Sequence, residues 1–197
     1  MVPPPPVDTS VFFSETFDQQ SNLSPAFTPV NGGGRVVSAD NGGYLELPQT
    51  PKSEHGVLFG SALAEGIRVG ARFRAESSKE GDATFAVGLS GLEGYRLRVN
   101  PKRQRLELLR GTVLAYDVEF QSVPGQWTHL RLQVRALPGL KWAIEGKAWD
   151  ESQIEPEAWT LEWADTAEPE LGQAAVWGTP HGGQPVAVDD VRLWRVD

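Results

Sequence analysis

The chain of 197 residues contains no cysteine and only one methionine. The absence of cysteine excludes a disulfide scaffold and a zinc site built on thiolates, but it leaves the cellular compartment undecided. No apolar run approaches the roughly 18 residues that would span a membrane as a helix. No helical periodicity extends over three turns. A chain of this size buries about 70% of its unfolded surface, so it can fold on an apolar core alone.

The charge of the chain is negative overall but unevenly distributed. Residues 1–66 carry 2 basic and 7 acidic side chains, residues 67–135 carry 12 and 7, and residues 136–197 carry 4 and 12. The three parts therefore have net charges of −5, +5 and −8, which sum to the −8 of the whole chain. A negative protein is a poor general partner for nucleic acid. The basic middle part still allows a local anionic ligand.

The pattern of residues 127–149 determines the fold class. Leu130, Leu132 and Val134 alternate with polar residues, which is the period of a strand with one buried and one solvated face. Pro138-Gly139 then provides a turn, and the alternation resumes from residue 141. This stretch predicts a long antiparallel hairpin.

Similar short runs with turn residues between them fill the rest of the chain. They are residues 11–17, 35–39, 44–47, 57–60, 67–75, 84–90, 95–100, 105–109, 112–120, 172–178 and 186–196. This spacing predicts an all-β protein, a two-sheet antiparallel β-sandwich of the jelly-roll type, with the last strand pairing with the first. We expect residues 10–197 to form one domain and residues 150–170 to cross between strands as an acidic, Trp-rich segment. We expect residues 1–9 to be a Pro-rich linker or an added leader.

Several stretches carry a resemblance to a known superfamily. In chain order they are Phe13–Asp18, Gly94–Val99, Leu106–Gly111, Gly125–Leu132, Lys147–Trp149, Glu155–Trp159 and Val188–Leu193. Together they resemble the concanavalin A-like lectin/glucanase superfamily, in its bacterial laminin-G-like and carbohydrate-binding-module branches, over about residues 10–196. The resemblance implies two curved sheets of five to seven strands, with a concave face that binds or cleaves glycans in many relatives.

This resemblance favours a non-catalytic, lectin-like carbohydrate-binding domain of a bacterial protein that is extracellular, periplasmic or on the cell surface. A structural or adhesion module that contacts other domains or chains is one alternative, and a glycoside hydrolase is another. Related glucanases carry a Glu-x-Asp-x-x-Glu strand, whose carboxylates act as nucleophile and acid/base. The nearest approach here, Glu162 to Glu168, has the wrong period, so no catalytic residue is predicted.

The resemblance also implies a structural Ca²⁺ between the first and last strands. The matching carboxylates are Glu15, Asp18, Asp189 and Asp190, which carbonyl oxygens would supplement. Adjacent strand residues point to opposite faces, so only one of Asp189 and Asp190 is expected to face any given site. Alternatively, one of the pair faces solvent and the other accepts backbone hydrogen bonds.

Arginines and tryptophans are the candidates for direct glycan contact. If their strands share a sheet, the arginines form a basic stripe that suits a carboxylated or sulfated polysaccharide; they are Arg72, Arg74, Arg96, Arg98, Arg131 and Arg135. The alternative is cross-strand pairing with Glu76, Glu107 or Glu119.

Three further tryptophans lie in expected loops or loop ends. Trp159, Trp163 and Trp177 could form a platform for the apolar face of a sugar ring, with Tyr44 or Tyr116 as alternates. Capping the end of the sandwich is the competing role for these rings. Trp127, Trp142 and Trp194 lie in regular strands and are expected in the core or covering a sheet.

Overall fold

The computed structural model describes residues 10–39, 42–139 and 141–196, so the predicted leader at residues 1–9 lies outside the described part. The elements are β1 (Val11–Glu15), β2 (Phe27–Val30), β3 (Arg35–Ala39), β4 (Gly42–Leu47), β5 (His55–Leu63), β6 (Ile67–Ala75), β7 (Thr84–Leu89), β8 (Tyr95–Asn100), the 3₁₀ turn η1 (Pro101–Arg103), β9 (Arg105–Arg110), β10 (Val113–Glu119), β11 (Thr128–Leu137), β12 (Lys141–Asp150), β13 (Leu161–Asp165), β14 (Gly172–Thr179) and β15 (Val186–Arg195). No helix among these elements is long and apolar enough to cross a membrane.

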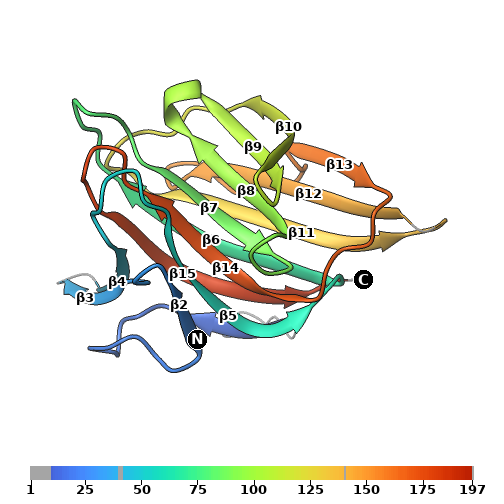
Figure 1. The fold of residues 1–197 in the computed structure, drawn as a ribbon, viewed down its shortest axis with the longest axis horizontal. Helices are drawn as coiled ribbons and strands as arrows, with labels where there is room; N and C mark the ends of the chain where they lie inside the picture. The colour runs from blue at the N-terminus through green and yellow to red at the C-terminus, as the bar shows by residue number, and fades with distance from the viewer. Residues whose placement is uncertain (1–9, 40–41, 140, 197) are drawn as a thin grey trace, which may run out of the picture.

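The strands form two antiparallel sheets that pack face to face (Figure 1). The eight-stranded sheet has the order β13-β12-β11-β6-β15-β4-β3, with β1 added beside β15. The seven-stranded sheet has the order β10-β9-β8-β7-β14-β5-β2. In Figure 1 the edge strands β10 and β13 lie on one side of the molecule, and β3 and β4 lie on the other. The predicted two-sheet β-sandwich is confirmed, as is the pairing of the first strand with the last.

The core lies between the sheets and is closely packed. Phe73 of β6 stacks on Phe85 of β7 across the sandwich, with ring centroids 5.1 Å apart. Gly146 of β12 approaches Leu97 of β8 so closely that a Cβ at this glycine would lie 2.6 Å from the leucine Cδ1. Each large apolar side chain buried here contributes about 1.5–3 kcal/mol to stability.

The strands differ from the prediction in two places. β2 and β13 were not predicted, and the second of them turns part of the expected acidic crossing into an edge strand paired with β12. Counting β1, one sheet has eight strands rather than five to seven. The polar face of β12 is not solvated either, because Glu145 and Lys147 are only 5% and 7% exposed.

A buried polar cluster joins the two sheets near their β10–β13 side. The Tyr95 hydroxyl donates to Asp165 at 2.7 Å, and the Arg110 guanidinium contacts the same carboxylate at 2.6 Å. Burial works to raise the pKa of Asp165, but hydrogen bonds from Ala167 N–H and Tyr95 and the charge of Arg110 outweigh it, so the pKa lies below its ordinary value. Burial and the hydrogen bond to Asp165 raise the pKa of Tyr95.

We expect Asp165→Asn to lower the free energy of unfolding by about 1–3 kcal/mol at neutral pH, because Arg110 loses its charged partner. A carboxyl with a lowered pKa contributes its stability above the unfolded-state value of 3.8, and the contribution is lost as pH falls through the lower folded-state value. Urea unfolding of both proteins at pH 7 and near pH 2.5 measures this difference. An undiminished difference at the acidic pH would contradict the assignment.

Candidate functional site

The predicted arginine stripe is divided between the two outer faces of the sandwich. Arg72 and Arg74 on β6 and Arg131 on β11 belong to the eight-stranded sheet. Arg96 and Arg98 on β8 belong to the seven-stranded sheet. Because each arginine alternates with core residues on its strand, all five point outward, and the two groups lie on opposite surfaces. The arginines therefore do not share one sheet, and the prediction of a single basic stripe is wrong.

The outer face of the eight-stranded sheet is covered by alternating cations and indole rings. Arg72 and Arg74 lie over Trp127, with Cζ to ring-centroid distances of 4.6 and 4.8 Å. Arg131 lies 4.7 Å from the centroid of Trp194 and also contacts Trp149. These cations occupy ring faces that a sugar would otherwise use.

Arg72 and Arg131 are also paired with carboxylates. The segment after β12 folds over this face, and its Glu155 contacts both Arg131 and Lys147 at 2.7 Å. Lys147 also donates to the carbonyl of Pro156. A hollow of about 240 Å³ remains beside Gly70, Trp149 and Trp194. The pairing indicates that this face holds the 151–160 segment in place.

The carboxylates expected to bind Ca²⁺ are occupied by arginine. Arg72 contacts Asp189 at 2.7 Å and Asp190 at 3.1 Å. A β-bulge with φ of +51° at Asp190 brings both neighbouring carboxylates to one guanidinium, so the expectation that only one could face a shared site is wrong.

The other two expected calcium ligands are also engaged. Glu15 accepts from the backbone N–H of Phe17 and from Gln20, and Asp18 accepts from the N–H of Gly43. Across residues 10–39, 42–139 and 141–196, no three His, Cys, Asp or Glu side chains form a cluster that could hold a metal. The donor set present therefore does not fit Ca²⁺, which prefers six to eight oxygens.

The three tryptophans of the expected loop platform are separated. Trp159 lies on the segment after β12, with Lys147 over its ring at 4.9 Å. Trp163 lies in β13, packs against the core and meets Tyr95 edge to face. Trp177 lies in β14 on the outer face of the seven-stranded sheet. The prediction that these three rings form a shared platform is therefore wrong.

The outer face of the seven-stranded sheet brings Arg96, Arg98 and Trp177 together. The strand registers place one cross-strand row over five strands; its members are Glu107, Arg98, Ala86, Trp177 and Gly56. Arg96 lies in the next row and contacts the ring of Trp177.

Glu107 anchors the polar end of that row. It is fully buried, and its carboxylate accepts from Arg98 at 2.7 Å, Arg103 at 2.8 Å and Asn100 at 3.1 Å. The cross-strand pairing considered as an alternative for Arg98 is therefore present. Arg103 also lies 4.0 Å from Asp117, so the arginines of this cluster are matched by carboxylates.

A groove of about 760 Å³ runs beside this row. Its lining comes from the ends of β7, β8 and β14 and from four neighbouring connections: Lys52, Glu54, Glu80, Gly81, Asp82, Thr84, Arg98, Asn100, Lys102, Arg103, Thr179 and His181. Among the described residues Lys52 and Lys102 have no carboxylate within ion-pair distance. The groove thus presents hydroxyl, amide, carboxylate and free ammonium groups side by side.

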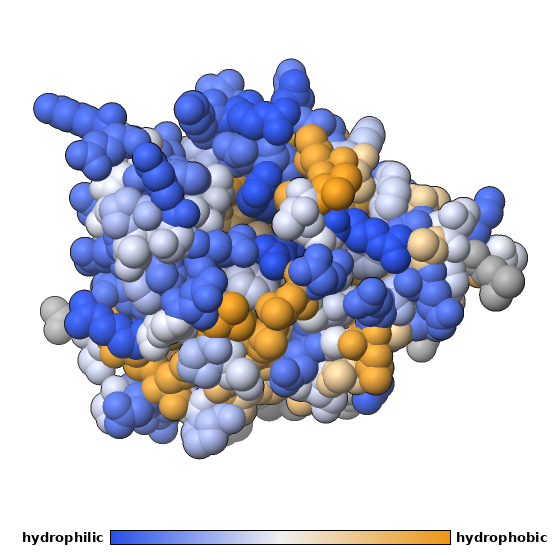
Figure 2. Space-filling view, in the orientation of Figure 1, coloured by the Kyte–Doolittle hydropathy of each residue, from blue (hydrophilic) through white to orange (hydrophobic). Residues whose placement is uncertain are grey.

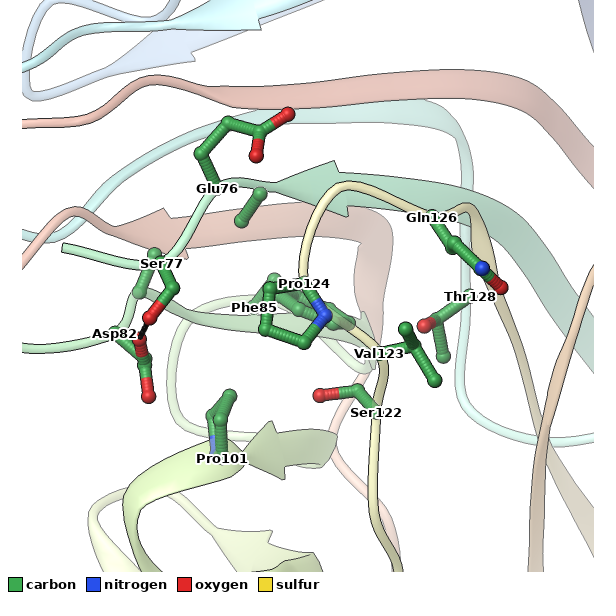
Figure 3. Close-up of a pocket in the computed structure, with 12 residues that line it drawn as sticks. Glu76, Ser77, Asp82, Phe85, Pro101, Ser122, Val123, Pro124, Gln126 and Thr128 are labelled. Carbon is green, nitrogen blue, oxygen red and sulfur yellow. Dashed lines mark hydrogen bonds between the residues drawn. The ribbon is translucent and has the colours of Figure 1, made fainter.

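A second cavity lies at one end of the sandwich, between the loops that carry Ser77, Pro101 and Pro124 (Figure 3). Its volume is about 20 Å³, which is room for roughly one water. The Ser77 hydroxyl donates to Asp82 at its margin. This cavity is too small for a sugar, so the groove is the better candidate site.

Comparison with solved structures identifies the architecture. The carbohydrate-binding module CBM66 from Bacillus subtilis matches with a TM-score of 0.59 at 11% identity, covering 86% of this chain and 95% of that one. The exoplasmic/lumenal domain of VIP36 in its Ca²⁺-bound form matches with a TM-score of 0.62 at 11% identity, covering 93% and 90%. This chain has the concanavalin A-like fold.

A third match to this concanavalin A-like domain is a structure described with endo-acting O-glycanases of the human gut microbiota. Its TM-score is 0.61 at 12% identity, covering 95% of this chain and all of that one. No family model and no curated protein sequence matches. Since binding and enzymatic proteins share the fold, the likeness establishes architecture and leaves function to the site.

Most groove residues of this concanavalin A-like domain were not predicted from the sequence. Among them only Arg98 is a predicted site residue; Asn100 ends the predicted strand 95–100, and Lys52 and Lys102 fall between the predicted strands. One feature of the sequence does point to this surface: Arg98 and Glu107 lie on successive strands and can pair, which indicates a polar outer face. The turn sequence alone does not reveal that the connections around residues 52, 80, 102 and 181 meet.

We expect Arg72→Met to lower the free energy of unfolding by about 3 kcal/mol, because Asp189 would be left buried without its partner. Arg72 is 23% exposed and Asp189 only 7%. The matched control is Arg35→Met, which breaks a pair whose arginine is 75% exposed and should cost less than about 0.5 kcal/mol. Equal costs for the two substitutions in urea unfolding would show that the Arg72 cluster is not structural.

Proposed function

We propose that the chain is a non-catalytic carbohydrate-binding domain and that the groove beside β7, β8 and β14 binds polysaccharide. The observation that carries the proposal is the 760 Å³ groove with its converging polar side chains. Pockets for small ligands combine a recess with a few placed polar groups, and both are present here. The carbohydrate-binding proteins of the same fold support the assignment.

We further propose that the polysaccharide carries carboxylate or sulfate groups. The groove lining contains Lys52 and Lys102 without ion-pair partners among the described residues, beside the guanidinium groups of Arg98 and Arg103. Arginine forks and ammonium groups suit such anions. The lining has four basic side chains against the three carboxylates of Glu54, Glu80 and Asp82, on a chain of net charge −8.

The groove offers less support for hydrolysis. Glu107 is bound by two arginines, and Glu54 is paired with Arg96 at 2.7 Å. A retaining glycosidase needs two carboxyl groups about 5–5.5 Å apart, one of which transfers a proton. Carboxylates tied to arginine are poorly placed for that proton transfer. The other two carboxylates of the lining, Glu80 and Asp82, lie on one loop, and Asp82 accepts a hydrogen bond from the Ser77 hydroxyl. The VIP36 neighbour, an exoplasmic/lumenal domain, supports the extracellular, periplasmic or surface location that we propose for the parent protein. The Bacillus subtilis neighbour CBM66 supports the proposed bacterial origin.

We expect the protein to bind polygalacturonate or chondroitin sulfate more tightly than neutral xylan or mannan. The binding should weaken as salt rises, because salt screens exposed charges. Lys52→Ala and Lys102→Ala should each lower affinity about 1.5- to 5-fold at low salt, the range of one exposed ion pair. Lys141→Ala, on the β11–β12 hairpin, is the matched control and should change nothing.

Isothermal titration with Ca²⁺ and with EDTA checks this proposal. Equal affinity in both is expected, since the candidate calcium ligands are occupied by other groups. Salt-insensitive binding to neutral glycans would contradict the anionic ligand, and no binding to any polysaccharide would contradict the function. Tighter binding and a higher melting temperature in Ca²⁺ would support the calcium site that the structure does not favour.

A second candidate function, assembly with another copy, rests on exposed apolar side chains at one end of the sandwich. Leu92, Val113 and Leu171 are 46%, 69% and 74% exposed. Backbone hydrogen bonds join their loops, from Gly91 to Gln173 and from Gly111 to Gly94. On the face shown in Figure 2, however, apolar residues form separate patches among hydrophilic ones.

If this end is an assembly surface, the molecular mass measured by light scattering should rise with protein concentration. Leu171→Gln should then abolish the rise, because it removes an exposed apolar contact. A constant monomer mass across the concentration range would remove this candidate.

A further inference from the structure

Trp177 lies in the cross-strand row that leads into the groove, yet it is only 2% exposed. Its ring lies across the sheet because the neighbouring strands provide glycines. A Cβ at Gly56 would lie 2.5 Å from the ring carbon Cε3, and a Cβ at Gly88 would lie 3.1 Å from Nε1. The indole therefore rests over Gly56 and Gly88, with one ring face against the sheet and the other directed outward.

Arg96 covers the outward face. It is the cross-strand partner of Gly88, so its side chain can pass over that glycine to reach the ring. The guanidinium carbon lies 4.2 Å from the centroid of Trp177. Its two terminal nitrogens are held by Glu54 at 2.7 Å and by the carbonyl of Leu92 at 2.9 Å.

Two buried donors in this stack have no protein acceptor. They are Nε1 of Trp177 and Nε of Arg96. A buried donor without an acceptor is unfavourable, and buried polar groups are almost always paired. The arrangement would therefore gain from a ligand that offers oxygen atoms beside the ring. The indole face itself matches the C–H face of a pyranose.

We propose that Trp177 is a sugar-stacking subsite of the groove and that Arg96 is its movable cover. This inference rests on the proposed carbohydrate-binding function. When polysaccharide binds, the guanidinium turns away, a sugar ring takes its place on the indole, and Nε1 of Trp177 donates to a sugar oxygen. Glu54, which holds the cover, also lines the groove and is 41% exposed, so the tether is a solvent-screened ion pair.

The cover can be tested without any polysaccharide. Arg96→Met keeps an apolar stem and removes the guanidinium, so acrylamide should quench one more tryptophan than in the parent protein. The additional quenching should vanish when Trp177→Phe is added to Arg96→Met. Unchanged quenching in Arg96→Met would contradict the proposal that Arg96 covers the ring of Trp177.

The subsite is tested by titration with polygalacturonate. Trp177→Phe keeps a flat ring but removes Nε1, and it should lower affinity about 3- to 10-fold, the effect of one hydrogen bond. Arg96→Met should raise affinity, because no cover has to be displaced. Arg74→Met is the matched control, since it removes a guanidinium from Trp127 on the opposite face, and it should leave affinity unchanged.

The outcomes separate this inference from the proposed function. If Lys52→Ala and Lys102→Ala weaken binding but Trp177→Phe does not, the groove binds polysaccharide and the assignment of Trp177 as a subsite is wrong. If neither the parent protein nor Arg96→Met binds any polysaccharide, the proposed function fails and the subsite fails with it. In either case the quenching experiment shows whether Arg96 covers the ring of Trp177. Circular dichroism of each variant excludes misfolding as the cause.

Discussion

Successive side chains of a strand point to opposite faces, and this constraint determines what each surface of the protein can do. On β8 it sends Tyr95, Leu97 and Val99 into the core and leaves Arg96 and Arg98 outside. The register with β7 and β14 then aligns Arg98 with Ala86 and Trp177. The core and the candidate site are therefore two sides of the same strands, so a shift of register would disrupt both.

Arginine has different roles on the two outer faces. On the eight-stranded sheet, Arg72 and Arg131 lie between indole rings and carboxylates and hold loops against the sheet. On the seven-stranded sheet, Arg98 and Arg103 converge on Glu107 beside an open groove. The first arrangement satisfies its charges internally. The second adjoins a recess in which Lys52 and Lys102 have no ion-pair partner among the described residues, and this is the physical difference between a structural surface and a binding one.

The sequence was sufficient for most strands, because alternation is local information. It predicted β3 and β6 to the residue and located the β11–β12 hairpin. It missed β13, whose five residues lie in an acidic, Trp-rich context and are stabilised by pairing with β12. Local pattern likewise could not show that β6 and β8 belong to different sheets. The groove lies where distant loops meet, so its residues could not be identified from periodicity.

The pairing of the first and last strands has a mechanical consequence. β1 and β15 run antiparallel, with Val11 opposite Trp194, and the N–H of Arg195 donates to the carbonyl of Ser10. The chain therefore enters and leaves the domain at adjacent points of one sheet. A force applied through the two ends would open this ladder one hydrogen bond at a time instead of shearing all of them together. Tethered in this way, the domain would yield first at β1, while the sheet that carries the groove would initially bear none of the load.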